Sequence, residues 1–353
     1  MITRTSPSCQ MENRDLAPVE QASWQELLSG STISAAQLLK ILEIDASELA
    51  ASEYGEVDFS SLDFPVRAPT PFIQRMKKGD IHDPLLQQVL PLAKEQEISP
   101  GFTHDPLQEA LSNVAPGLIH KYHGRALCIV SKACAIHCRY CFRRHFPYED
   151  NQPGREQWSK AFSYLKAQTD IREIIYSGGD PLASSDKHLA WLTERMADIP
   201  HIQRLRIHTR LPVVLPQRVD NQLLEWLNRW HGQKVIVIHS NHAQELDASV
   251  KHAIEQLKST GATVLNQTVL LKGINDSVDA LVNLSEKLFD IGVLPYYLHL
   301  LDPVVGAGHF AIADARAKRL MGAVSAKLPG YLVPRLVREQ AQRESKTLIL
   351  PTL

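Results

Sequence analysis

From Arg125 onward, short apolar and β-branched runs alternate with longer segments in which apolar residues recur at helical spacing. The runs predict strands at 126–130, 173–176, 204–208, 234–239, 263–270 and 294–300. The segments between them predict helices near 155–169, 186–198, 216–230, 244–260 and 277–291. Strands and helices that alternate through right-handed crossovers build a parallel sheet. Periodicity leaves two α/β architectures open, a doubly wound open sheet and an incomplete barrel.

The residues before this repeat have a different pattern. Apolar residues at helical spacing, separated by breaks that contain proline and glycine, predict helices at 21–28, 34–42 and 85–94. No pattern typical of a chemical site occurs in this part of the sequence. We therefore expect a mainly helical N-terminal region, an α/β core, and a short C-terminal segment with a helix, at 1–115, 116–310 and 311–353.

The charges of the chain nearly cancel, with 38 lysines and arginines against 39 aspartates and glutamates in 353 residues. This balance provides no field that would attract nucleic acid or an anionic membrane. The longest apolar runs, such as 235–238 and 348–350, are too short to span a bilayer, and the polar N-terminus lacks a signal-peptide core. We expect a soluble, cytoplasmic protein that binds small molecules, with neither nucleic-acid nor membrane partners.

Directly after the first strand of the repeat, three cysteines form a C-x3-C-x2-C pattern: Cys134, Cys138 and Cys141. Soft thiolates at this spacing suit a cubane 4Fe–4S cluster. Because three ligands for four irons leave one iron open to an external molecule, the pattern indicates a cluster that takes part in chemistry.

Two other interpretations of the cysteines remain open. A zinc ion could take His137 or His145 as its fourth ligand, although structural zinc sites usually pair two short cysteine knuckles and no second knuckle is present. Unpaired core thiols would also give three cysteines. A disulfide framework is a poor fit, because isolated Cys9 and Cys128 in a long chain without a signal peptide indicate reduced thiols.

A pair of glycines, Gly178 and Gly179, follows the second strand and precedes Asp180. Glycine permits positive φ and close approach of the backbone to a ligand, although a plain turn has the same sequence. Together with the cysteine pattern, this pair resembles the radical S-adenosylmethionine (AdoMet) enzymes. The resemblance implies a partial (β/α)6 barrel whose cluster loop follows the first strand. It further implies that Tyr140 lies beside the adenine of AdoMet and that both glycines contact the methionine ammonium of AdoMet. Asp180 is then expected either to hold the glycine loop in place or to bind that ammonium.

Longer segments narrow the resemblance to the lysine 2,3-aminomutases, and they recur in order over roughly residues 60–353. They lie at 117–122, 134–144, 178–182, 210–218, 266–276 and 306–310. This family moves the α-amino group of L-lysine to the β carbon with AdoMet, a 4Fe–4S cluster and pyridoxal 5′-phosphate (PLP). The hydrogen on C3 is unactivated, so the family removes it with a 5′-deoxyadenosyl radical while a PLP aldimine receives the migrating nitrogen.

The same resemblance assigns the PLP lysine. In the family it follows a Gly-Tyr-x-Val-Pro segment, which stands here at 330–334, and counting forward reaches Lys346. The family's glycine-rich approach is replaced by 342–345, and an ordinary solvated lysine is the alternative interpretation. Lys121 and Arg125 match basic positions that hold the PLP phosphate, and Lys121 replaces an arginine.

Substrate contacts follow in the same manner. Arg143 matches the arginine that grips the lysine carboxylate with two parallel hydrogen bonds, and a solvated basic run is its alternative. Asp302 and Glu339 match the two acidic groups that hold the ε-ammonium. Glu339 replaces an aspartate and adds one methylene, which shifts the ammonium by about a bond length.

The absence of further cysteines makes the chain resemble a shorter form of the family without its structural zinc. Ser277 stands where a zinc cysteine is found, and the sequence ends at Leu353. That form makes β-lysine for elongation factor P and its β-lysine ligase. We expect L-lysine as substrate, an electron donor such as flavodoxin or ferredoxin, and a homo-oligomer. An aminomutase for another amino acid such as glutamate, or a non-enzymatic iron–sulfur protein, remains open.

Overall fold

The computed structural model describes residues 22–60, 64–147 and 154–352. These residues form one sheet of ten strands that lie in sequence order from β1 to β10. Strands β3 to β9 are parallel, whereas β1 and β2 at one edge and β10 at the other pair antiparallel. Because β1 and β10 are the two ends of this order, the sheet is open. The α/β fold with a partial barrel is therefore confirmed.

All six strands expected from the sequence are present, within two residues at each end. The strands are β1 (Asn113–Ala115), β2 (Leu118–Tyr122), β3 (Arg125–Ser131), β4 (Glu173–Gly178), β5 (Arg204–Thr209), β6 (Gln233–His239), β7 (Thr263–Leu270), β8 (Leu294–Leu300), β9 (Arg335–Arg338) and β10 (Thr347–Leu348). Sequence analysis missed β1, β2, β9 and β10, which are short or carry charges between their apolar residues. The C-terminal segment thus adds a parallel strand and an antiparallel strand to the barrel sheet.

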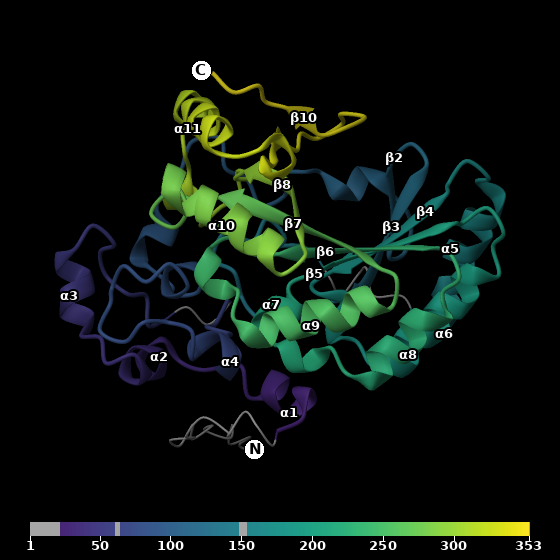
Figure 1. Cartoon of the computed structure of the whole chain (residues 1–353), viewed down its shortest axis with the longest axis horizontal. Coiled ribbons are helices and arrows are strands. Elements are labelled where there is room, and N and C mark those ends of the chain that lie inside the picture. The colour runs from purple at the N-terminus through teal and green to yellow at the C-terminus, as the bar shows by residue number, and fades with distance from the viewer. Residues whose placement is uncertain (1–21, 61–63, 148–153, 353) are drawn as a thin grey trace, which may run out of the picture.

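Helices of the repeat lie along one side of the sheet, and the C-terminal segment lies away from α1 (Figure 1). The repeat contains α5 (Arg155–Ala167), α6 (Asp186–Ala197), α7 (Leu211–Val214), α8 (Asn221–Arg229), α9 (Ala248–Ser259) and α10 (Val278–Asp290), and the C-terminal segment contains α11 (Asp314–Lys327). Helices α8 and α9 begin later than expected because an aspartate caps each one. Asp220 accepts a hydrogen bond from the amide of Leu223 at 2.9 Å, and Asp247 accepts one from that of Val250 at 3.0 Å.

The N-terminal region consists of short helices. They are α1 (Trp24–Ser29), α2 (Ala35–Ile41), α3 (Ala46–Ala51) and α4 (Thr70–Ile73). The helix expected at 85–94 is wrong, since only two 3-10 turns form there, η1 (Leu86–Gln88) and η2 (Ala93–Gln96). Pro91 lies between them, and proline removes a helical donor and disfavours helical backbone in the residue before it.

Further 3-10 turns connect the barrel elements. They are η3 (Glu109–Ser112), η4 (Pro181–Ala183), η5 (Pro216–Arg218), η6 (Ala243–Glu245), η7 (Gly308–Phe310) and η8 (Gly330–Leu332). Most of them follow the carboxyl end of a parallel strand. Side chains from distant parts of the sequence therefore meet at this edge of the sheet.

The two faces of the sheet differ in polarity. On β5, Leu205 and Ile207 are buried in the main hydrophobic cluster, whereas Arg206 and His208 on the other face are partly exposed. On β8, Leu298 lies in the cluster beneath α11, and His299 faces the other way. One face thus packs against helices, and the opposite face, which is the inside of the partial barrel, carries polar side chains.

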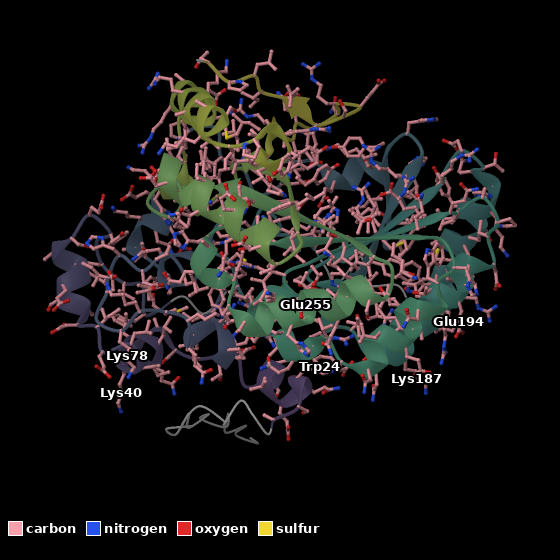
Figure 2. All side chains as sticks on the ribbon, in the orientation of Figure 1. Trp24, Lys40, Lys78, Lys187, Glu194 and Glu255 are labelled. Carbon is pink, nitrogen blue, oxygen red and sulfur yellow. The ribbon has the colours of Figure 1, made fainter. Side chains whose placement is uncertain are left out.

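The main hydrophobic cluster contains residues of the N-terminal helices as well as of the barrel, including Leu38, Phe72 and Ile174. Charged side chains such as Lys40, Lys78 and Lys187 project from the periphery of the molecule (Figure 2). Within the described residues, no helix has both the length and the apolar character needed to cross a membrane. The division at 115 and 310 stays a prediction.

Candidate active site

The cysteine loop follows β3, where the sequence placed it. Cys134, Cys138 and Cys141 are partly buried and unpaired with one another as disulfides. Burial raises the pKa of the Cys134 thiol far above its usual value, and the charge of Cys141 raises it further. The effect of Cys141 indicates that the two thiols lie close together. Metal ions bind the deprotonated thiolate, and a cluster's positive charge favours that form.

Three cysteine thiols on one loop are the donor set that a 4Fe–4S cluster requires, since such clusters are held by thiolates. Within the described residues, no group of three or more histidine, cysteine or acidic side chains is arranged to hold a single metal ion.

The N-terminal region holds the cysteine loop from outside. The Glu95 carboxylate accepts hydrogen bonds from Arg139 Nε at 2.7 Å and Nη2 at 2.5 Å, and from Arg144 Nη2 at 2.9 Å. The amide of Arg139 donates to the Gln88 carbonyl, and that of His137 donates to the Arg67 carbonyl, both at 2.9 Å. The loop that carries the thiols is thus fixed by side chains and backbone more than 40 residues upstream.

The two glycines after β4 touch this loop directly. A Cβ on Gly178 would lie 2.4 Å from the Ser131 carbonyl oxygen, and one on Gly179 would lie 2.6 Å from that of Ala133. The Gly179 amide donates to Ser131 at 2.7 Å, and the Asp180 amide donates to Ala133 at 2.8 Å. Sequence reasoning placed a ligand against these glycines, and the structure places the cysteine-loop backbone there. Their contact with AdoMet stays a prediction.

Asp180 connects the same turn to the end of β5. Its carboxylate accepts hydrogen bonds from Thr209 Oγ1 and the Arg210 amide at 2.7 Å, and from the amides of Leu182 and Leu211 at 3.1 Å. Burial raises the pKa of Asp180, and these hydrogen bonds oppose the rise. Of the two roles expected for Asp180, the contacts describe loop fixation.

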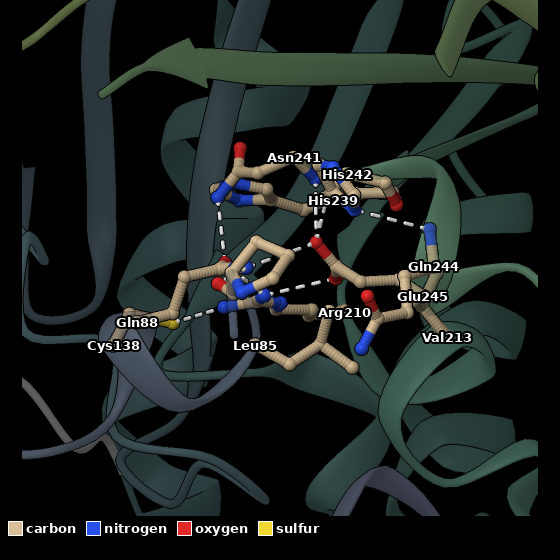
Figure 3. A network of polar contacts seen from close by, with 12 residues as sticks. Leu85, Gln88, Cys138, Arg210, Val213, His239, Asn241, His242, Gln244 and Glu245 are labelled. Atoms are coloured by element: carbon tan, nitrogen blue, oxygen red, sulfur yellow. Dashed lines mark hydrogen bonds and ion pairs between the residues drawn. The ribbon is translucent and has the colours of Figure 1, made fainter. Parts of the chain in front are cut away.

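A buried polar network centred on Arg210 lies behind the cysteine loop (Figure 3). Arg210 Nη1 donates to Cys138 Sγ at 2.7 Å and to the Tyr140 hydroxyl at 2.8 Å. Arg210 Nη2 donates to Gln88 Oε1 at 2.6 Å and forms an ion pair with Glu245 at 2.9 Å. Burial of Arg210 opposes its charge, whereas Cys138, Tyr140 and Glu245 raise its pKa well above the usual value.

Sequence reasoning assigned no role to Arg210, Asn241 or Glu245. Arg210 begins one of the segments that resemble the family, and the other signal is position, since each of the three follows the carboxyl end of β5 or β6. The Tyr140 hydroxyl accepts from Asn241 Nδ2 at 2.6 Å, and the ring is almost fully buried. The tyrosine therefore belongs to this network, and its place beside adenine stays a prediction.

A second group of charges surrounds Lys346, which lies just before β10. Lys346 Nζ forms an ion pair with Glu339, and Lys121 Nζ approaches the same carboxylate at 3.0 Å. The Tyr122 hydroxyl donates to it at 2.8 Å. Burial would raise the pKa of Glu339, but Lys346 and Lys121 hold it well below its usual range. Asp302 lies nearby, where burial, and then Glu339, raise its pKa to about 7.

This group has the donors that a PLP site requires. Lys346 Nζ is 6.0 Å from the centre of the Tyr297 ring, which places an aromatic surface beside the amine. Lys121 and Arg125 flank the Tyr122 ring, with Lys121 Nζ at 5.2 Å and Arg125 Cζ at 4.6 Å from its centre. An amine, aromatic rings and two nearby cations fit an aromatic cofactor with a phosphate.

Arg143 lies between the two groups. Its Nε and Nη2 donate to the two oxygens of Glu109 at 2.8 and 2.6 Å, and its Nη1 donates to Ser177 Oγ at 3.0 Å and the Gly178 carbonyl at 3.1 Å. A pocket of about 130 Å³ beside this pair is lined in part by His104, Glu109, Asn113, Phe142, Arg143 and His145. Sequence reasoning found Arg143 but missed Glu109.

Electrostatic coupling links these groups across the inside of the barrel. Burial lowers the pKa of His208 on β5 far below its usual value, and the charges of Lys346 and Arg143 add to the effect. The charges of Glu339 and Glu109 raise the pKa of Asp302, and the charge of Lys346 lowers it. The structure therefore brings the residues expected to bind PLP and substrate to the same space, beside the cysteine loop.

Comparisons with known proteins agree with this geometry. The Radical SAM superfamily profile matches residues 128–284. The "L-lysine 2,3-aminomutase" of Escherichia coli is 47% identical over 326 residues, which cover 92% of this chain and 93% of that protein. Proteins of the same name from Haemophilus influenzae and Clostridium subterminale are 44% and 33% identical, over 93% and 80% of this chain and 96% and 68% of theirs.

Proposed function

The chain belongs to the L-lysine 2,3-aminomutase family of radical SAM proteins, and from that membership we propose that it converts L-α-lysine to β-lysine. Lysine 2,3-aminomutases use a 4Fe–4S cluster, AdoMet and PLP. When bound, these groups supply a carbon radical strong enough to remove an unactivated hydrogen and a π system that receives nitrogen. The observation that supports the proposal most is that Arg143, two residues after Cys141, and Lys346, which is paired with Glu339, both lie near enough to His208 of β5 to lower its pKa.

The cluster and AdoMet belong at the cysteine loop. We assign the three iron ligands to Cys134, Cys138 and Cys141, which the Glu95 clamp and the glycine turn hold in place. Tyr140, Gly178, Gly179 and Asp180 border the same loop and are assigned to the AdoMet site. These residues would orient the thiolates of a bound cluster.

Lys346 is assigned as the amine that holds PLP, with Lys121 and Arg125 as partners of its phosphate. The Glu339 carboxylate contacts both Lys346 and Lys121. Binding a phosphate at Lys121 competes with the Lys121–Glu339 ion pair.

Recognition of lysine requires a cation in the protein that binds the lysine carboxylate and, at the other end of the site, an anion that binds the ε-ammonium. Arg143 is assigned to the lysine carboxylate because its planar guanidinium binds carboxylates with two parallel bonds. Asp302 and Glu339 are assigned to the ε-ammonium, and the charge of Glu339 raises the pKa of Asp302. A lysine substrate that spans the site places its carboxylate at Arg143 and its ε-ammonium beside the two acidic side chains. Glutamate would instead place a further carboxylate beside those two acidic side chains.

Further steps follow from the family rather than from contacts within the chain. We propose that the β-lysine serves elongation factor P through a β-lysine ligase, and that a flavodoxin or ferredoxin supplies the electron. An oxygen-sensitive cluster is best kept in a reducing compartment such as the cytoplasm. A homo-oligomer is also proposed.

Anaerobic reconstitution with iron, sulfide, PLP, AdoMet and a reductant tests the activity. We expect β-lysine from L-lysine and no β-glutamate from L-glutamate. Lys346→Ala should lose the visible absorbance of bound PLP while it retains iron and sulfide, and exposed Lys187→Ala serves as the matched control (Figure 2). AdoMet cleavage by the wild type without any β-amino product contradicts the proposal.

A further inference from the structure

The Arg143 guanidinium already holds a carboxylate, and it is one that the chain itself provides. Nε and Nη2, which form the side-on edge of the group, donate to the two oxygens of Glu109. Both side chains are largely buried, with 7% of Arg143 and 11% of Glu109 exposed. A bidentate pair of this kind is among the strongest polar contacts in proteins.

The other edge of the guanidinium is committed elsewhere. Nη1 donates to Ser177 Oγ at 3.0 Å and to the Gly178 carbonyl at 3.1 Å, both on β4. An end-on grip on a carboxylate needs Nη1 and Nη2 together, so it would have to break these bonds. A substrate carboxylate that binds Arg143 with two hydrogen bonds must therefore take the edge that Glu109 occupies.

Glu109 lies on a short connecting segment that contacts strand β2. It begins η3, a single turn that joins the N-terminal region to β1. The residue before it, Gln108, has φ of +50°, a conformation that is strained for residues other than glycine. The pocket beside the pair, which His104 and Asn113 help to line, offers the displaced carboxylate space and polar partners.

The same segment touches the loop that carries Lys346. Gln342 Nε2 donates to Gln108 Oε1 at 3.1 Å, and Gln342 also has positive φ, at +61°. Residues 340–346 connect Glu339 on one side to Lys346 on the other. Movement of Glu109 is thereby connected through Gln108 and Gln342 to the loop expected to hold the cofactor.

We propose that Glu109 is a specificity residue that occupies the carboxylate site on Arg143 and is displaced when the amino acid substrate binds. The substrate class named here, an amino acid with a free carboxylate, rests on the proposed function. Ligands without a carboxylate cannot replace Glu109, so they leave the segment at η3 in place. Displacement leaves the Glu109 charge beside the incoming carboxylate, which opposes substrate binding.

Substrate affinity in the absence of turnover tests the proposal. PLP-loaded protein purified without oxygen is titrated with L-lysine and with L-lysinamide, and AdoMet is left out. Glu109→Gln keeps the shape of the side chain and removes its charge, so it should bind L-lysine at least about fivefold more tightly, the lower end of typical coupling between sites. Its affinity for L-lysinamide should equal that of the wild type.

Asp105→Asn is the matched control. Asp105 lines the same pocket and loses the same charge, but its carboxylate contacts the Glu109 amide and not Arg143. This variant should bind both ligands as the wild type does. If Glu109→Gln binds L-lysine equally well or more weakly, Glu109 orients Arg143 instead, and the proposal is overturned.

A second measurement avoids lysine. Acetate should raise the melting temperature of Glu109→Gln more than that of the wild type, since a ligand that binds only the folded state stabilises it. Acetamide should not distinguish the two proteins. Equal acetate effects overturn the proposal. Should the wild type fail to bind lysine while the acetate difference is present, the proposed function is wrong and the role of Glu109 stands.

Discussion

Replacing Glu95 with glutamine should destabilise the protein more than any change to its exposed ion pairs. The Glu95 carboxylate is 4% exposed and neutralises two guanidinium groups, Arg139 at 1% and Arg144 at 9% exposure. Glutamine retains the shape but leaves these cations without a counter-charge. Breaking a buried pair by removing one partner costs about 3–5 kcal/mol, a large part of the 5–15 kcal/mol typical of whole proteins.

The assay is urea unfolding of wild type and variant, with the free energy of unfolding obtained by linear extrapolation. Glu194→Gln is the matched control, because Glu194 pairs with Arg229 on the surface, where both side chains are more than half exposed. Figure 2 shows Glu194 at the periphery of the molecule. Such exposed pairs contribute about 0–1 kcal/mol.

The cysteine loop should respond together with stability. Because Arg139 lies next to Cys138 in the chain, release of its side chain frees the loop, and reconstituted Glu95→Gln should retain less iron and sulfide than Glu194→Gln. The double variant with Arg139→Gln should lose less than the sum of the single changes, since the two residues contact each other. Equal stability and equal iron content in Glu95→Gln and Glu194→Gln would refute the reasoning.

Two further outcomes follow from the site. Burial raises the pKa of Asp302 from 3.8 to about 7, so between these values the folded protein holds a proton that the unfolded chain releases. The free energy of unfolding should therefore fall as pH rises through this window, and urea unfolding of Asp302→Asn should lack that fall; an unchanged pH profile in the variant contradicts the assignment. A Cβ at Gly179 would lie 2.6 Å from the Ala133 carbonyl oxygen. Gly179→Ala should lose iron on reconstitution, whereas Gly330→Ala, with no atom within 4 Å of its added carbon, should not; equal iron in both contradicts it.

Local pattern explains where sequence reasoning succeeded and failed. The six parallel strands of the repeat were predicted because apolar and β-branched residues recur in short runs, as in Thr263–Leu270. The helix expected at 85–94 failed because apolar spacing was counted across Pro91, where helical backbone ends. Strand β9 was missed because it is four residues long and begins and ends with arginine. Residues 335–338 form a strand because they pair with β8. The two strands are too far apart in the sequence for a local pattern to reveal this pairing.

The amino-acid sequence by itself determined the parallel α/β repeat and the family, and it predicted the cysteine ligand set, because periodicity, short-range spacing and ordered motifs are properties of the chain. Only the tertiary structure decided which charges meet. Arg143 and Glu109 are 34 residues apart, and Arg139 and Glu95 are 44 apart. No periodic pattern in the sequence relates residues that are so far apart. Their pairing depends on how the N-terminal region packs against the barrel. Charges that are buried there must be paired, because an unpaired buried charge costs much free energy.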